Sequence, residues 1–191
     1  MSLQIKGYHG LCWMEPVELT GLFDYLRTRN SFLEIGSASG VTAALVSREH
    51  PDLKITCIDP FYEYEEEPGD RHLNWVKNKT DNMSLFKGTF YQYLMQCPSD
   101  TEFDAVLVDG GHAYDECLSD LRSAYRVLKP DGILFVHDYS DPNWMSVKRA
   151  VHRFLDETLD WRVLEVRNSL MVLVRMPITP EQYMDLPEDR K

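Results

Sequence analysis

Short apolar runs alternate with amphipathic segments along most of the chain. Four runs have the length and composition of strands that are covered on both faces, namely residues 32–35, 53–59, 105–108 and 133–137. Four other segments repeat apolar residues at helical spacing, namely residues 13–29, 41–50, 114–128 and 143–157. Strands that alternate with helices predict an α/β fold, in which a largely parallel sheet lies between helical layers.

Weaker patterns complete the predicted sheet. Residues 82–87 are expected to form a third strand, which a turn at Gly88-Thr89 joins to a further helix. Residues 161–167 and 169–176 are expected to form two strands connected around Asn168-Ser169, a pattern that is typical of a hairpin.

The length of 191 residues fits one domain over residues 1–191, with enough chain to bury a full sheet. Residues 1–29 are expected to form a helical cover. Residues 61–75 are expected to be an inserted loop rich in acidic and aromatic side chains, and residues 177–191 a Pro-rich, charged tail.

The most informative stretch runs from Ser31 to Gly40 and reads S-F-L-E-I-G-S-A-S-G. An apolar run passes through Glu34 into a loop of small residues, and the loop leads into the next helix. Gly36 and Gly40 can adopt backbone angles that are closed to other residues, and Ser37 between them leaves room for a ligand against the backbone. The stretch predicts a cradle for a ligand, although an ordinary strand-turn-helix corner has the same outline.

The spacing within this cradle separates two classes of cofactor. A dinucleotide-binding fold uses G-x-G-x-x-G and places a pyrophosphate at the helix N-terminus. This chain has E-x-G-x-x-x-G, formed by Glu34, Gly36 and Gly40, and a carboxylate suits a sulfonium cofactor with an ammonium group better than a pyrophosphate. The pattern resembles motif I of the class I S-adenosylmethionine (SAM) dependent methyltransferases. This resemblance implies that Glu34, Gly36, Ser37 and Gly40 bind the methyl donor.

Asp59 follows Gly40 by 19 residues and ends the second predicted strand. A parallel βαβ unit brings this position beside the first strand, where a carboxylate can accept hydrogen bonds from a ribose diol. SAM and NAD both contain ribose, so Asp59 predicts a nucleoside ligand without choosing between them; a helix cap or a turn acid is the structural alternative. Phe61 is a candidate for packing on the adenine, and the resemblance assigns Thr89 to the adenine amine.

A second informative stretch covers residues 103–140. Its apolar strand leads to Asp109, on the edge where open α/β sheets bind ligands. The motifs D-G-G-H-x-Y, L-K-P-D-G and H-D-Y resemble a branch of class I methyltransferases that includes many sugar and natural-product O-methyltransferases. The resemblance covers roughly residues 10–176. It implies a Rossmann-like three-layer sandwich with a seven-stranded, mostly parallel sheet whose last strand is antiparallel, and it places Asp109 in the donor site.

The same resemblance indicates how a methyl acceptor is activated. Metal-dependent O-methyltransferases have an aspartate after the fourth strand, a base three residues later and an Asp-Asn pair after the fifth strand. Asp109, His112 and Asp138 fill these positions, whereas Tyr139 stands in place of the Asn. The resemblance therefore implies Mg²⁺ or another divalent cation on Asp109 and Asp138, with His112 as the general base. His137 is the reserve base and is expected to be structural, because it should face away from its neighbour on the strand.

These features predict an enzyme that transfers a methyl group from SAM to a hydroxyl of a small-molecule or glycan acceptor. Three alternatives stay open: methylation of nitrogen, an NAD(P)-dependent oxidoreductase, and a non-catalytic module with a SAM-binding fold. The acceptor has no recognisable motif. Its pocket is expected to be built from the N-terminal segment, the loop at 61–75 and the loop after Tyr139.

Charge and composition narrow the partners. A formal net charge of −11 argues against binding to nucleic acid or to an anionic membrane. The four cysteines, at 12, 57, 97 and 117, are too widely spaced for a metal motif and are expected to be reduced and mostly buried. No signal-peptide pattern and no apolar run of roughly 20 residues is present, which predicts a cytoplasmic protein. Oligomeric state stays open, with a homodimer as one option.

Overall fold

A seven-stranded mixed sheet forms the centre of the structure, a computed structural model that describes residues 3–62, 69–176 and 179. The strand order is β3-β2-β1-β4-β5-β7-β6. Strands β1 to β5 pair in parallel, and β7 is antiparallel to both of its neighbours. The strands are β1 (Ser31–Ile35), β2 (Lys54–Asp59), β3 (Met83–Lys87), β4 (Phe103–Val108), β5 (Leu128–Val136), β6 (Trp161–Arg167) and β7 (Leu170–Arg175).

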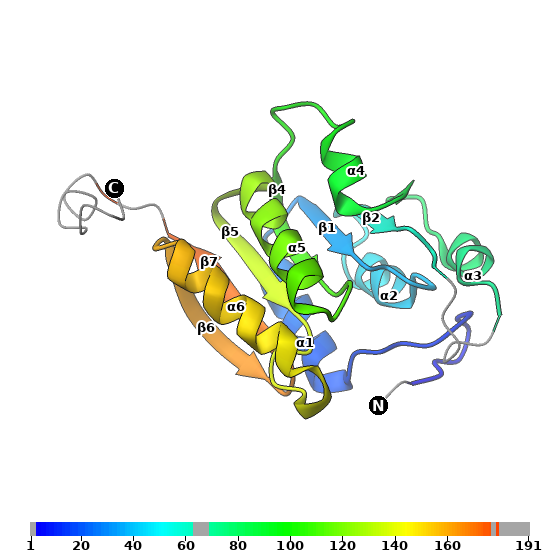
Figure 1. The fold of residues 1–191 in the computed structure, drawn as a ribbon. Helices are drawn as coiled ribbons and strands as arrows, with labels where there is room; N and C mark the ends of the chain where they lie inside the picture. Colours follow the sequence, from blue (N-terminus) through cyan, green and yellow to red (C-terminus); the bar gives the residue numbers. More distant parts are fainter. Residues whose placement is uncertain (1–2, 63–68, 177–178, 180–191) are drawn as a thin grey trace.

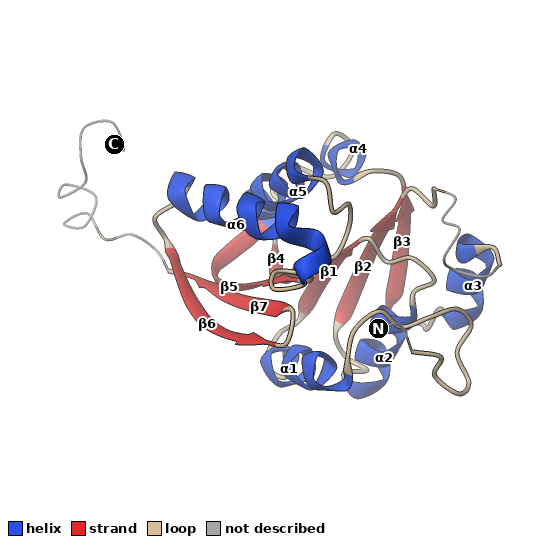
Figure 2. Ribbon diagram, turned by 60° about the horizontal axis from the view of Figure 1, so that its bottom comes forward, coloured by secondary structure: helices blue, strands red, loops and turns tan. Residues whose placement is uncertain are grey.

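Helices cover both faces of this sheet. One face carries α4 (Phe90–Leu94), α5 (Tyr114–Val127) and α6 (Met145–Glu157), and the other carries α1 (Pro16–Leu26), α2 (Val41–Glu49) and α3 (Arg71–Asn78) (Figures 1 and 2). A short 3₁₀ turn, η1 (Pro142–Trp144), leads into α6. The predicted three-layer α/β sandwich is therefore confirmed, including the antiparallel direction of the last strand in the chain, β7.

The two-residue alternation of the strands builds two cores, one under each helical layer. On β1, Phe32 belongs to the core beneath α1 and α2, whereas Leu33 belongs to the core beneath α5 and α6. Glu34 shares the face of Phe32 and is buried in the first core. The carboxylate of Glu34 is therefore buried directly before the glycine loop.

The chain order of the strands reverses between β1 and β4, which pair side by side in parallel. Loops that leave the carboxyl ends of such neighbouring strands run in opposite directions and leave a crevice between them, which is where ligands of open α/β sheets bind. The Gly36–Gly40 loop follows β1 and the Asp109–His112 loop follows β4, so both predicted motifs meet at this crevice.

Two elements differ from the sequence prediction. Helix α3 replaces part of the expected loop at 61–75, and Asp70 caps it by accepting a hydrogen bond from the backbone of Leu73 at 2.9 Å. Strand β5 begins at Leu128 instead of residue 133, because the pairing with β4 shifts register across the L-K-P-D-G turn. The acidic run at 65–67 lies outside the described residues, as does the predicted tail except for Thr179.

All four cysteines are free thiols, and three are buried, as predicted; only Cys97 is partly exposed. None of the helices in the described part of the chain has the length and apolar character that a bilayer crossing requires.

Candidate functional site

The glycine loop after β1 is held tightly against the end of β4. Gly36 has φ +86°, and a Cβ atom placed on it would lie 2.1 Å from the carbonyl oxygen of Asp109. Gly40 has φ +72° and would bring a Cβ atom within 2.5 Å of the Trp75 ring. Only glycine fits at these two positions, because the backbone is left-handed and a Cβ atom would overlap the Asp109 carbonyl or the Trp75 ring. The predicted tight loop between strand and helix is therefore present, and Trp75 of α3 packs against it, a contact that no sequence pattern indicates.

Glu34 lies just before this loop and is almost fully buried, at 1% exposure. The thiol of Cys57 on β2 donates to its Oε2 atom at 3.6 Å. Burial raises the pKa of Glu34 well above its usual range, and the nearby negative charges of Asp109 and Asp59 raise it further. The three acids predicted to surround one nucleoside are thus close enough to interact electrostatically.

Ser37 supplies the clearest opening for a polar ligand group in the cradle. Its side chain is buried, and its Oγ atom has no hydrogen-bond partner among the described residues. A buried hydroxyl without a hydrogen-bond partner lowers the stability of the folded protein. A polar group of a bound donor fits this position.

Asp59 is at the end of β2, as predicted, but its carboxylate is already engaged. It accepts hydrogen bonds from the backbone of Ala38 at 2.8 Å and of Phe61 at 2.6 Å, while Arg71 lies 3.7 Å away. Each carboxylate oxygen offers more than one acceptor position, so the bonds to the glycine loop leave capacity for a ribose diol. Asp59 also fixes the loop, which is a structural role that the spacing alone does not indicate.

The two predicted adenine contacts have other partners in this structure. The ring of Phe61 packs against His72, with 4.9 Å between ring centroids. Thr89 is the N-cap of α4 and accepts a hydrogen bond from the backbone of Gln92 at 3.2 Å. The side-chain oxygen of Gln92 accepts a hydrogen bond from the backbone N–H of Thr89, which completes a capping box.

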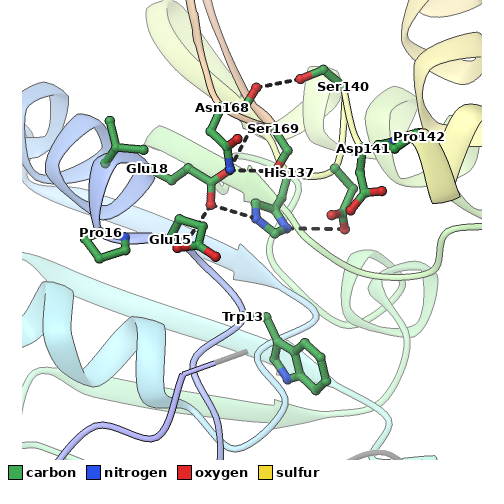
Figure 3. A pocket seen from close by; sticks show the side chains of 12 residues that line it. Trp13, Glu15, Pro16, Glu18, His137, Ser140, Asp141, Pro142, Asn168 and Ser169 are labelled. Carbon is green, nitrogen blue, oxygen red and sulfur yellow. Dashed lines mark hydrogen bonds and ion pairs between the residues drawn. The ribbon is translucent and has the colours of Figure 1, made fainter. Parts of the chain in front are cut away.

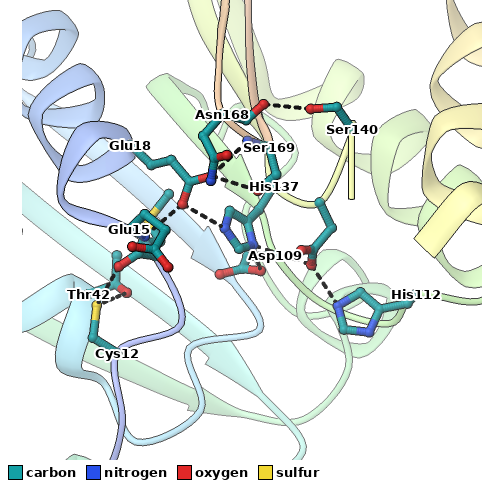
Figure 4. Close-up of polar contacts among 12 residues, drawn as sticks. Cys12, Glu15, Glu18, Thr42, Asp109, His112, His137, Ser140, Asn168 and Ser169 are labelled. Carbon is teal, nitrogen blue, oxygen red and sulfur yellow. Dashed lines mark hydrogen bonds and ion pairs between the residues drawn. The ribbon is translucent and has the colours of Figure 1, made fainter. Parts of the chain in front are cut away.

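A cluster of two acids and two histidines occupies the ends of β4 and β5. His112 Nε2 lies 2.9 Å from Asp138 Oδ2, and His137 Nδ1 lies 3.0 Å from Asp109 Oδ1 and 3.3 Å from Asp138 Oδ2 (Figure 4). The ring of His112 is stacked on Trp144, with 4.1 Å between centroids. The structure therefore brings together Asp109, His112 and Asp138 as the motifs predicted.

The expectation that His137 faces away from Asp138 is wrong. Strand β5 ends at Val136, so the alternation of side chains no longer holds at positions 137 and 138. Asp138 has φ +60°, a left-handed conformation that turns its carboxylate back toward both histidines.

The two histidines are stabilised in their charged forms. Burial opposes a positive charge on His137, but Asp109, Asp138 and Glu18 outweigh it and raise its pKa well above the usual range. Burial likewise opposes the charge on His112, while Asp138 raises its pKa. In turn, the two rings overcome the burial of Asp138 and hold its pKa below the usual range.

Glu18 of α1 belongs to the same network, and the sequence analysis missed it. Its Oε2 atom lies 3.3 Å from His137 Nε2, on the far side of the ring from Asp109. Its Oε1 atom accepts from the side chain of Asn168 and from the backbone and hydroxyl of Ser169, in the β6–β7 turn. Burial alone would raise the pKa of Glu18, but the hydrogen bonds to His137 and Ser169 outweigh it and lower the pKa to about 2. The backbone N–H of Glu15 also donates to the Oε2 atom at 2.7 Å. No local motif indicates the wider network, because its other partners lie more than a hundred residues away.

Asp109, His137 and Asp138 offer ligand atoms that all lie within 4.8 Å of one another. Carboxylate oxygens suit Mg²⁺, and an imidazole nitrogen is also acceptable to Mn²⁺ and other transition ions. The set fits a divalent cation and contains His137 in addition to the predicted pair. Tyr139, at the position of the expected Asn, points its hydroxyl to His152 at 3.0 Å instead.

A cavity of about 640 Å³ adjoins this cluster. Its walls come from the start of α1, the loop after β5 and the β6–β7 turn (Figure 3). His137 and Asp138 form the side toward the cluster, and Trp13 lies across from Asn168 and Ser140 in this view. The volume is that of a site for a small organic molecule.

The geometry agrees with the comparison with known families. A model of the methyltransferase domain family matches residues 33–139, which is more than half of the chain. The chain belongs to the methyltransferase domain family. The match begins in β1 and ends directly after the H-D-Y motif, so it contains the cradle, Asp59 and the acid-histidine cluster of this methyltransferase.

Several solved structures of other proteins have the same fold as this methyltransferase. A protein from Staphylococcus aureus assigned as a caffeoyl-CoA O-methyltransferase is 14% identical, with a TM-score of 0.66 over 86% of this chain and 85% of that chain. An O-methyltransferase from Bacillus cereus, in complex with S-adenosylhomocysteine, is 12% identical, with a TM-score of 0.63 over 86% and 82%. The O-methyltransferase TomG from Streptomyces achromogenes, in complex with SAM, is 19% identical, with a TM-score of 0.59 over 83% and 78%. No curated protein sequence matches the chain significantly.

Proposed function

We propose that this methyltransferase moves a methyl group from SAM to a hydroxyl oxygen of a small-molecule or glycan acceptor, with His112 as the general base. The observation that carries the proposal is the position of the acid-histidine cluster, between the glycine cradle and a cavity of ligand size. A donor site, a proton acceptor and an acceptor pocket would then adjoin one another along the edge of a single sheet.

The donor site is assigned to the residues around the β1–β4 crevice. SAM supplies a methyl group on a positively charged sulfur, which a hydroxyl oxygen can attack in line. Asp59 would accept the ribose hydroxyls, Ser37 would donate to a polar group of the donor, and Asp109 would lie near the sulfonium end. A positively charged donor would favour the ionised form of Glu34, whose pKa is raised by burial when no cation is near. The glycines keep side chains out of the space where the donor lies.

His112 has the surroundings of a general base. Its Nε2 atom donates to Asp138, which leaves Nδ1 as the ring nitrogen that can take a proton from the acceptor hydroxyl. Asp138 favours the protonated ring, and the stack on Trp144 holds the ring plane in place. General base catalysis of this kind contributes about 10² to 10⁴ in rate. The plainer alternative is a histidine that only anchors its loop.

A divalent cation fits Asp109, His137 and Asp138, and it would supply a positive charge that lowers the pKa of a bound hydroxyl. The proton that His137 carries would have to leave before its Nδ1 atom could act as a ligand. Metal binding should therefore release a proton and weaken as pH falls.

Calorimetry tests the donor site without knowledge of the acceptor. The protein should bind S-adenosylhomocysteine and should not bind NADH, which also tests the oxidoreductase alternative. Asp59→Asn should weaken binding of S-adenosylhomocysteine, whereas His112→Ala should leave it unchanged. Binding of NADH in preference to S-adenosylhomocysteine would contradict the proposal.

The base assignment is tested by turnover. Hydroxyl compounds are screened with SAM, and formation of S-adenosylhomocysteine is measured for the wild type, His112→Ala and the matched surface variant His152→Ala. His112→Ala should slow transfer by about 10² or more, because the proton then has no acceptor. An equal rate of transfer in all three proteins would contradict the assignment of His112 as the base. A wild-type protein that methylates none of the compounds would favour the non-catalytic alternative.

Metal binding is predicted to depend on the cluster and is measured with Mn²⁺ by electron paramagnetic resonance. Asp109→Asn should lower the affinity by about tenfold or more, because one of the two carboxylate ligands is lost. Asp156→Asn removes an equal charge from the exposed face of α6 and should change nothing. Equal Mn²⁺ affinity in the wild type and Asp109→Asn would mean that the ion, if bound at all, sits elsewhere.

A further inference from the structure

The loop that carries His112 lies outside the regular elements of the fold. It joins β4, which ends at Val108, to α5, which begins at Tyr114, and the residues between them belong to no helix or strand. Gly110 and Gly111 come directly before His112, and glycine leaves the backbone more freedom than other residues do. A general base must lie within about 3 Å of the proton that it takes, so this loop needs partners elsewhere in the fold.

The start of α6 supplies two of these partners. The indole of Trp144 is stacked on the ring of His112, with 4.1 Å between the centroids and 22° between the ring planes. The hydroxyl of Ser146 donates to the backbone carbonyl oxygen of His112 at 2.6 Å. With the 2.9 Å contact between His112 Nε2 and Asp138 Oδ2, three separate side chains hold one residue.

Each of the three contacts restricts a different movement of His112. The hydrogen bond from Ser146 holds the backbone, and the one to Asp138 holds the position of Nε2. Asp138 alone would still let the ring turn about the line of its hydrogen bond, and the stack on Trp144 removes that freedom. The Nδ1 lone pair lies in the plane of the ring, so the three contacts together set the direction in which it points.

The segment that carries Trp144 and Ser146 is itself firmly held. Val147 and Ala150 of α6 are buried in the core beneath α5 and α6. The backbone N–H of Trp144 donates to the carbonyl oxygen of Asp141 at 3.0 Å, within η1. Functional side chains are positioned precisely when the residues that support them stand on rigid elements, and α6 is such a support.

The same segment connects His112 to the cavity. After β5 the chain forms part of the cavity wall and then returns to His112 at Trp144. The residues of this segment that line the cavity are Asp138, Ser140, Asp141 and Pro142. The direction of the imidazole is therefore fixed relative to the wall against which the proposed acceptor would lie.

We infer that Trp144 and Ser146 are positioning residues for the general base, and that with Asp138 they direct Nδ1 of His112 toward the hydroxyl of the methyl acceptor. In the transfer, His112 takes the hydroxyl proton at Nδ1 while the acceptor oxygen bonds to the methyl carbon of the donor and the carbon–sulfur bond breaks. Trp144 and Ser146 act through His112 and not on the reacting atoms. This inference rests on the proposed function, because it assumes that His112 is the base.

The stack is tested first, without an acceptor. The ring C–H signals of His112 are recorded by NMR on protein with labelled histidine, and His112→Ala identifies them among the signals of the six histidines. An indole face over the ring should shift these signals upfield in the wild type. Trp144→Leu should remove the shift, whereas Trp144→Phe should retain part of it. Met145→Ala, an exposed change in the same turn, should retain all of it.

Turnover then tests positioning, with an acceptor found in the screen of hydroxyl compounds. Trp144→Leu should lower kcat about tenfold or more, because a displacement of about 1 Å is enough for a large loss of rate. Ser146→Ala should lower kcat about threefold or more. Acceptor KM and affinity for S-adenosylhomocysteine should change less than about twofold, since neither residue contributes to ground-state binding. Trp144→Phe should recover most of the lost rate, and Met145→Ala should match the wild type.

Ring signals that Trp144→Leu does not move, or a kcat in Trp144→Leu and Ser146→Ala equal to that of Met145→Ala, would overturn the inference and leave the proposed function intact. A higher acceptor KM with unchanged kcat would overturn it too, because Trp144 would then bind the acceptor. A loss of S-adenosylhomocysteine affinity as large as the loss of rate would show a structural role only, which also overturns it. If His112→Ala does not slow transfer, or the wild type methylates no compound, the base assignment fails and the inference fails with it.

Discussion

Asp138 shows how one backbone angle decides the shape of the site. Its φ of +60° follows directly on the regular strand β5 and turns its carboxylate toward both His112 and His137. The residue types at this edge of the sheet are readable from the sequence, as Asp109, His112 and Asp138 demonstrate. Their orientation is not, because strand alternation stops where β5 stops, and this is why His137 was predicted to face the wrong way.

Gly36 is predicted to tolerate no side chain. Gly36→Ala combines a left-handed backbone with a contact 2.1 Å from the Asp109 carbonyl, so it should lower the free energy of unfolding by about 3 kcal/mol or more. Gly7→Ala is the matched control, since φ is +91° there but no atom lies within 4 Å. It should cost only about 1–2 kcal/mol in the same urea titration. Equal losses would mean that the crowding at Asp109 is relieved without cost.

Asp120 of α5 should make stability depend on pH. Burial, and then the charge of Glu116, raise its pKa to about 7, so the folded protein holds a proton that the unfolded chain releases near pH 4. The free energy of unfolding should therefore fall as pH rises from about 4 to about 7. Asp120→Asn removes this loss and should be more stable than the wild type at pH 8, on the order of 2 kcal/mol, with little difference at pH 4.

Urea titrations at both pH values check this prediction for Asp120. Asp115→Asn, on the exposed start of the same helix, serves as the control and should show no such gain at pH 8. A stabilisation of Asp120→Asn that is the same at pH 4 and pH 8 would contradict the proton linkage.

At the scale of elements, helix α1 is attached to the rest of the fold by a buried carboxylate as well as by its apolar face. Apolar spacing predicts that a helix exists near residues 13–29 and that it packs on the sheet, and the structure has α1 at Pro16–Leu26. Spacing does not reveal that Glu18, inside that helix, reaches the β6–β7 turn and His137. Helix α3 was missed for a related reason, since its eight residues are too few for a clear periodic signal and its cap at Asp70 resembles a turn.

Glu18→Gln is predicted to loosen this attachment. The variant loses the charge that stabilises protonated His137, and a buried pair that loses one partner costs about 3–5 kcal/mol. Glu157→Gln breaks exposed pairs with Arg122 and Arg153 and should cost less than about 1 kcal/mol. Urea unfolding at neutral pH compares the two. Similar small losses in both variants would show that the Glu18 network contributes little.

At the scale of the whole molecule, the strand-helix alternation predicted the layers and the sheet well. Parallel strands are covered on both faces, so they leave a continuous apolar signal, as in β4, where Ala105, Val106 and Leu107 are fully buried. The cavity was predicted in part: the N-terminal segment and the loop after Tyr139 were expected to build a pocket and do line it, whereas the β6–β7 turn lines it in place of the loop expected at 61–75. Sequence could not indicate the turn, because the three segments are distant from one another along the chain. The chemistry of the cavity depends on side chains such as Glu15 and Asp141, which carry no motif.

The overall charge predicts that the protein does not bind polyanions such as RNA. With a formal net charge of −11, it should not bind RNA at physiological salt, because no surplus of basic side chains is available to displace counterions. Fluorescence anisotropy of a labelled RNA duplex should stay constant as protein is added, with a basic RNA-binding protein as the positive control. A rise in anisotropy that weakens with added salt would reverse the expectation.

The bond between Glu18 and Ser169 joins positions 151 residues apart. A ribosome adds roughly 5–20 residues per second, so the partner of this carboxylate appears about ten seconds or more after the helix that carries it. During that interval the Glu18 carboxylate lacks its partners in the β6–β7 turn and stays accessible to water. Completion of the terminal hairpin therefore completes the attachment of the first helix, and a ribosome-bound chain that stops short of it should leave the amino-terminal segment more open to proteases.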